Sequence, residues 1–164
     1  MLFYQGVTGF LPSYLIEVKG LTQSAASVLY GSFFVVAIAF QFFSGIVADR
    51  LGEPRAITVF SLLGLLSVVS LPFVYSRPAV ILLALGSSAV LGAIPPAHTH
   101  AVALLPEAIQ GSGYGLIRTA YIGLAAASLP LVGAVADAGY FSYVFFLFGA
   151  IVVCAAAISL LISE

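Results

Sequence analysis

Charged residues are scarce in this chain. Lys and Arg number 5 and Asp and Glu number 6, so charged residues make up 7% of the 164 positions, while hydrophobic residues make up 62%. Soluble domains usually contain about 25% charged and about 45–50% apolar residues, so this composition cannot cover a soluble surface and indicates a membrane protein. The net charge of −1, with no block of like charges, excludes the electrostatic footprint of a nucleic-acid-binding protein.

Cysteine is almost absent too. With Cys154 as the single cysteine, no intrachain disulfide and no cysteine metal site can form. His98 and His100 are two positions apart, which puts their imidazoles about 200° apart on a helix and not together on one metal ion. The sequence also lacks a Gly-x-Ser-Gly nucleophile with a matching histidine, and paired carboxylates for metal or phosphate chemistry. We therefore predict no enzyme, no cofactor, no metal site and no catalytic residue.

Six long apolar runs dominate the rest of the sequence. They cover approximately residues 1–16, 22–47, 56–75, 79–105, 114–136 and 141–162. A membrane span needs about 20 apolar residues, so six spans use roughly 120 positions and leave only short loops. The predicted fold class is an all-α membrane protein, a six-transmembrane-helix bundle in one domain over residues 1–164. The first run is short for a full crossing, which predicts a first helix truncated at its N-terminus.

Polar residues are shared unevenly among these runs. The third and the sixth are almost bare, whereas the other four carry Tyr, Gln, Ser, Thr, His and Arg. A helix that contacts only lipid can be uniformly apolar, but a helix that lines a wet cavity needs groups that bind water or solute. The pattern predicts that the third and sixth helices face lipid and that the other four surround a polar path.

The fifth run places its polar residues on one face. Tyr114, Arg118, Tyr121 and Ser128 lie at offsets of 0, 4, 7 and 14. At about 100° per residue, these offsets keep them within roughly 40° of one line. A charge inside a span costs about 2.5–3.5 kcal/mol at the membrane centre, so Arg118 needs a partner or a wet path. It either binds an anionic solute or takes part in a gate, or it pairs with Glu107 or snorkels to the interface.

Polar residues and prolines also mark runs two and four. Tyr30 and Gln41 lie on a stripe of the second run, where Gln41 either lines the cavity or hydrogen-bonds a neighbouring helix for about 0.6 kcal/mol. Pro95 and Pro96 interrupt the fourth run, and such a broken helix either marks a binding region or has no function. His98 follows, where an imidazole either carries a coupling proton or makes an interhelical hydrogen bond.

The loop after the second run has a distinctive pattern. Gly45, Asp49, Arg50 and Gly52 are spaced as Gly, three residues, Asp-Arg, one residue, Gly, and Arg55 stands one position later than expected for a closing arginine. This loop resembles the signature loop of the major facilitator superfamily, whose usual form ends in Gly-Arg-Arg. In that family the loop joins the second and third helices of each six-helix half, and its aspartate latches the cytoplasmic side against the opposite half. The resemblance extends over nearly all 164 residues.

The resemblance implies both a fold and an activity. The chain would be the C-terminal half of a twelve-helix major facilitator fold, with the first half as the alternative; the fourth run lacks the arginine common in that first half. It would be a multi-pass protein of the plasma (cytoplasmic) membrane that moves a small solute by secondary active transport with alternating access, as a symporter or antiporter. Its partners would be the solute, the lipid bilayer and the missing six-helix half, or a second copy if the protein pairs with itself. A non-transporting scaffold or receptor with the same fold is a further alternative.

The candidate residues fall into two groups. Those for the cavity are Tyr30, Gln41, His98, Tyr114, Arg118 and Tyr121. Those for the cytoplasmic gate, which the resemblance assigns, are Gly45, Asp49, Arg50, Gly52, Arg55 and Glu107.

Overall fold

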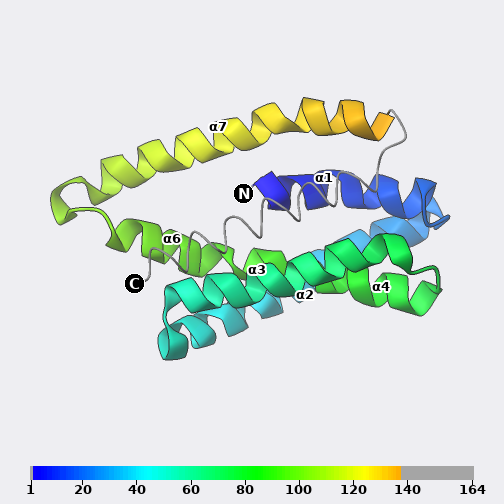
Figure 1. Ribbon diagram of the computed structural model, residues 1–164, viewed down its shortest axis with the longest axis horizontal. Coiled ribbons are helices and arrows are strands. Elements are labelled where there is room, and N and C mark those ends of the chain that lie inside the picture. Colours follow the sequence, from blue (N-terminus) through cyan, green and yellow to red (C-terminus); the bar gives the residue numbers. More distant parts are fainter. Residues whose placement is uncertain (1, 138–164) are drawn as a thin grey trace.

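The computed structural model describes residues 2–137, and every element in this part of the chain is helical (Figure 1). In chain order the elements are α1 (Leu2–Glu17), α2 (Gln23–Leu51), α3 (Glu53–Ser70), η1 (Leu71–Phe73), α4 (Arg77–Gly86), α5 (Ala89–Gly92), α6 (Ile94–Ala103), η2 (Glu107–Ile109) and α7 (Gln110–Asp137). Three segments, Gln23–Leu51, Glu53–Phe73 and Arg77–Ala103, are long and apolar enough to cross a membrane. The predicted all-α membrane class is confirmed here, and the predicted sixth helix lies outside the described residues.

A glycine turn joins α2 to α3. Gly52 has φ +87°, a backbone conformation that L side chains rarely adopt, and its N–H donates to the carbonyl oxygen of Ala48 at 2.8 Å. Pro54 stands in the first turn of α3, where a missing N–H costs little. At its other end α2 begins after Thr22, whose side-chain oxygen accepts the N–H of Ala25 at 3.3 Å. The charged loop is therefore a tight corner between two spans.

The fourth apolar run forms the centre of the described bundle. In its most apolar 18-residue stretch 50% of the residues are buried, against 33% for α3 with η1 and 17% for α2. Both α2 and α3 pack on α4, α5 and α6, while α1 packs on α2 and α7. Figure 1 shows α7 running along the side of α1 that faces away from α3 and α4. The most buried segment is thus the broken one.

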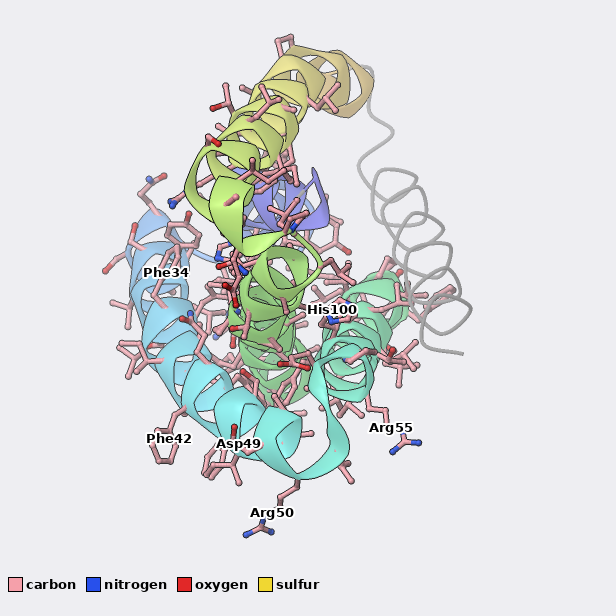
Figure 2. All side chains as sticks on the ribbon, turned by 90° about the vertical axis from the view of Figure 1, so that its left-hand side faces the viewer. Phe34, Phe42, Asp49, Arg50, Arg55 and His100 are labelled. Carbon is pink, nitrogen blue, oxygen red and sulfur yellow. The ribbon has the colours of Figure 1, made fainter. Side chains whose placement is uncertain are left out.

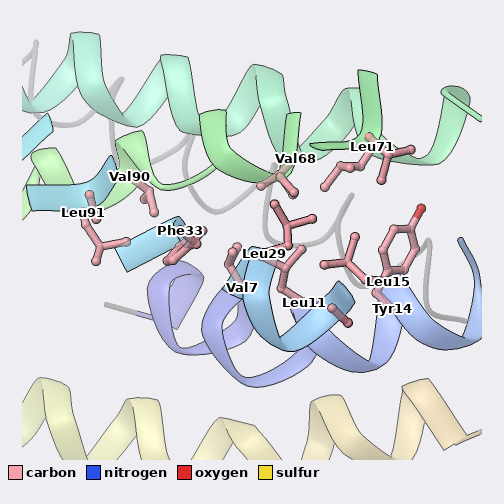
Figure 3. Packing of buried hydrophobic residues seen from close by; sticks show 14 of the residues in the cluster. Val7, Leu11, Tyr14, Leu15, Leu29, Phe33, Val68, Leu71, Val90 and Leu91 are labelled. Carbon is pink, nitrogen blue, oxygen red and sulfur yellow. The ribbon is translucent and has the colours of Figure 1, made fainter. Parts of the chain in front are cut away.

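Apolar side chains of α1, α2, α3, η1, α4 and α5 form the main core (Figure 3). Leu11, Leu15, Phe33, Val68 and Leu71 are each 0% exposed and belong to this one cluster. Because lipid tails are as apolar as leucine, expulsion of water does not drive such contacts inside a membrane, and close packing does. The fit between neighbouring helices therefore decides how they are arranged.

A glycine on α3 and a glycine on α5 let these two helices pack closely. A Cβ added at Gly64 would lie 2.7 Å from the backbone nitrogen of Val90, and one added at Gly92 would lie 2.7 Å from Cδ1 of Phe60. Small residues of this kind let helix backbones approach closely in membranes. Any larger residue at Gly64 would separate α3 from the central segment.

The fourth run is broken twice, and only one break was predicted. Pro95 and Pro96 stand in the first turn of α6, and the break precedes them at Ala93. The second break lies at Ser87 and Ser88, whose hydroxyls donate to the carbonyl oxygens three residues earlier at 2.6 Å each. Glycine and serine pairs kink helices, and these hydroxyls bond to backbone carbonyls of the preceding turn in competition with the regular helix pattern. The signal was a Gly-Ser-Ser sequence beginning at position 86.

Beyond Arg55, the exposed side of α3 is apolar. Val59, Leu62, Leu63 and Leu66 have between 40% and 64% of their surface exposed, whereas the opposite side packs on the central segment. Contact with lipid tails requires an exposed apolar surface of this kind, and the lipid contact of the third helix stays a prediction. The corresponding expectation for the sixth helix, residues 141–162, falls outside the described part of the chain.

Candidate functional site

Three of the predicted cavity residues meet where α6 and α7 lie against each other. The hydroxyl oxygen of Tyr121 is 3.2 Å from Nε2 of His98, which is hydrogen-bonding distance. The two rings are stacked with centroids 6.3 Å apart, and the ring of Tyr114 meets the imidazole edge-on at 5.8 Å. We call His98, Tyr114 and Tyr121 the α6–α7 cluster. It joins residues that are far apart in the sequence and lie on two different helices.

The α7 spacing explains how the cluster forms. Tyr114 and Tyr121 are seven positions apart, so they lie on one side of the helix two turns from each other and meet one imidazole together. Both are half-buried, whereas Arg118 between them is exposed. Arg118 is nevertheless close enough to His98 to act on it electrostatically. The side chain of Ser128, the fourth member of the predicted row, lies outside the described residues.

Arg118 does not pair with Glu107 here. Glu107 is exposed in η2, before α7 begins, and no ion pair joins the two side chains in the described part of the chain. The guanidinium therefore stands beside the cluster with its charge uncompensated by that acid. With two phenol groups and an imidazole next to it, this side of α7 offers a cation and several hydrogen-bonding groups to a polar solute.

The two α2 candidates are placed differently. The hydroxyl of Tyr30 donates to the carbonyl oxygen of Thr8 at 2.9 Å, which ties α2 to α1. Its ring also meets the ring of Phe34 edge-on at 5.1 Å. Gln41 is half-buried, and among the described residues its side chain shares no hydrogen bond with the α6–α7 cluster. Of the six predicted cavity residues, the structure brings three into contact and places Arg118 beside them.

The predicted gate residues gather at one end of the bundle. The α2–α3 corner and the α6–α7 connection lie at the same end (Figure 1). Figure 2 shows the side chains of Arg50 and Arg55 extending outward from the corner, and both they and Asp49 are exposed. A Cβ added at Gly45 would meet nothing within 4 Å, so no described helix uses the close approach that this glycine permits.

A site that the sequence did not single out lies at the opposite end. The Nζ of Lys19 donates to the carbonyl oxygens of Val74 at 2.8 Å and Pro72 at 3.4 Å, and lies 4.5 Å from the ring centroid of Tyr75 and 5.6 Å from that of Tyr14. Burial lowers the pKa of the Lys19 ammonium. The cation binds carbonyls at the end of η1, as cations near helix C-termini do. Its loop position gave no sequence signal of these contacts.

Comparison with known proteins gives one positive finding. A family model described as Major Facilitator Superfamily matches residues 1–164, the full length of the chain. No curated protein matches the chain.

Proposed function

Because the chain belongs to the Major Facilitator Superfamily, a family of membrane transporters, we propose that it is a secondary active transporter that moves a small solute by alternating access. In this proposal residues 1–164 form one six-helix domain, helices seven to twelve of a twelve-helix transporter in the plasma membrane. The other half completes the cavity, and the two halves rock about a central site.

The α6–α7 cluster with its neighbouring arginine is the observation that carries this proposal. Polar and ionisable groups inside membrane spans are costly, and they usually face a bundle interior or a water-filled path. Here an imidazole, two phenols and a guanidinium stand together in a chain that is 62% hydrophobic. They lie beside a broken helix, a feature that often marks the substrate site of transporters.

The gate proposal rests on where the charges stand. Asp49 lies in the last turn of α2, where the helix dipole disfavours a carboxylate. A contact between Asp49 and a helix N-terminus of the other half would offset that cost and hold the cytoplasmic side closed. Arg50, Arg55 and Glu107, all exposed at the same end, would complete this contact.

The open face of α2 is where the other half would pack. Val35 and Phe42 are 67% and 68% exposed, and a Cβ added at Gly31 or Gly45 would meet nothing within 4 Å. A row of small and apolar residues suits close helix packing in a membrane. We propose that the missing half covers this face. The alternative is a second copy of the chain, which cross-linking of the purified protein would reveal as a dimer.

Uptake into vesicles tests the function directly. Vesicles containing the protein are screened with labelled organic anions, cations and neutral solutes, and the variant Arg118→Gln is compared with Arg77→Gln, which removes an arginine at the opposite end. We expect at least one solute to accumulate, with accumulation lost in Arg118→Gln and kept in Arg77→Gln. Solute binding without uptake would contradict transport and favour the scaffold or receptor.

A further inference from the structure

The contact between His98 and Tyr121 contains a group that titrates near neutral pH. An imidazole has an ordinary pKa of about 6.5, whereas a phenol stays protonated to about pH 10. The pair joins the side chains of α6 and α7 at 3.2 Å. His98 and Tyr121 are both half-buried, and in the proposed transporter they line the water-filled path, which would supply and remove a proton. Geometry and access together make this contact responsive to pH.

We propose that His98 and Tyr121 form the proton-binding site of this half, in which the proton on His98 sets the direction of the hydrogen bond to Tyr121. This inference rests on the proposed transport function and adds protons to the species that the protein carries.

The two protonation states differ in what each group donates. In the neutral imidazole with its hydrogen on Nδ1, the Nε2 lone pair accepts the Tyr121 hydroxyl hydrogen. When a proton from water binds Nε2, that nitrogen becomes a donor and the phenol oxygen becomes the acceptor. The Tyr121 hydroxyl hydrogen must then turn toward another acceptor. The proton passes from hydronium to Nε2 and leaves a water molecule, and the hydrogen bond from the Tyr121 hydroxyl to Nε2 is replaced by one from Nε2–H to the phenol oxygen. No covalent bond of the protein breaks, and the direction of the contact between the helices reverses.

The charged surroundings link this proton to the solute. The titratable side chains of α7 that face His98 are Tyr114, Tyr121 and Arg118. The imidazole also sits on a helix that packs on α2, α3 and α5, and in the described part of the chain no carboxylate forms an ion pair with it. Protonation therefore places a second cation near Arg118 with no described carboxylate to balance it. A bound anionic solute would supply that balance, so proton and anion would each strengthen the binding of the other.

The protonation of His98 can be measured without knowing the solute. The whole chain carries two histidines, so the variant His100→Gln leaves one imidazole, whose ¹⁵N resonances in lipid bilayers report its charge. The probe is the proton alone, from about pH 4 to about pH 9. Tyr121→Phe, made in the same background, removes the hydroxyl and keeps the ring. Tyr75→Phe, at the opposite end of the bundle, removes an equivalent hydroxyl and serves as the control.

We expect one titration of His98 within this range. Tyr121→Phe should change its proton affinity by about threefold to tenfold, the range that loss of one hydrogen bond produces, whereas Tyr75→Phe should not. An imidazole that does not titrate, or that titrates identically in Tyr121→Phe, would overturn the inference. The result is independent of uptake: a titrating His98 in a protein that moves no solute would refute the transport proposal alone, and solute uptake with a silent His98 would refute the proton site alone.

Discussion

The substitution Gly64→Ala tests the packing that positions the central broken segment. The added Cβ would lie 2.7 Å from the backbone nitrogen of Val90 and 2.9 Å from its Cβ, and neither atom can move without moving α5. Overpacking of this kind typically destabilises a protein by about 1–3 kcal/mol. Alanine offsets part of this cost, because it stabilises a helix by about 0.5–1 kcal/mol relative to glycine. With a backbone atom in the way, we expect the cost near its upper end and a net destabilisation of about 2 kcal/mol.

A matched control separates the clash from the helix preference. A Cβ added at Gly31, on α2, would meet nothing within 4 Å, so Gly31→Ala should leave stability unchanged or raise it by up to about 1 kcal/mol. The assay is equilibrium unfolding of the purified chain in mixed micelles with increasing sodium dodecyl sulfate, followed by circular dichroism. If Gly64→Ala unfolds at the same point as Gly31→Ala, then α3 and α5 are not in backbone contact and the described packing is wrong.

Two further predictions concern Lys19, at one end of the bundle, and the hydrogen bond between α1 and α2. Lys19 is the single lysine of the chain, so its ¹⁵N resonance can be assigned directly. We expect this resonance to report a pKa below the ordinary value of 10.5, because burial disfavours the charged amine. Between the folded and unfolded pKa values the unfolded chain binds more protons than the folded chain, so the contribution of Lys19 to the free energy of unfolding should rise with pH across that window. A pKa at or above 10.5, or an unchanged pH dependence of stability in Lys19→Met, would show that the amine is solvated. Tyr30→Phe should lose about 0.6–1 kcal/mol of stability with its bond to the Thr8 carbonyl. Stability equal to that of the unmodified chain would mean that this bond does not fasten α1 to α2.

Spacing within one helix was enough to predict that two residues of the candidate site lie on the same face. Tyr114 and Tyr121 share a face of α7 because seven positions make nearly two turns, and that relation holds whatever the neighbouring helices do. The partner they meet could not be predicted in the same way. His98 follows two breaks, at Ser87–Ser88 and at Ala93, and each break turns the later helix by an amount that periodicity does not give.

The other contacts that the sequence did not predict join residues far apart in the chain. The acceptor of the Tyr30 hydroxyl lies 22 positions away on α1, and those of Lys19 lie 53 and 55 positions away at the end of η1. Such bonds depend on how helices pack, and packing inside a membrane depends on fit at small residues such as Gly64 more than on hydrophobicity. Composition predicted the helical class, but it could not identify the fourth run as the most buried segment.

The most direct test asks whether water reaches the Arg118 side of α7. In a chain with Cys154→Ser, the variants Arg118→Cys and Leu116→Cys each present one thiol; both positions are exposed, and they lie about 200° apart at nearly the same depth. A membrane-impermeant maleimide is applied to either face of sealed vesicles. The account predicts that the thiol of Arg118→Cys is modified from both faces and that of Leu116→Cys from neither. Modification of Arg118→Cys from neither face would contradict a water-filled cavity on this side of α7.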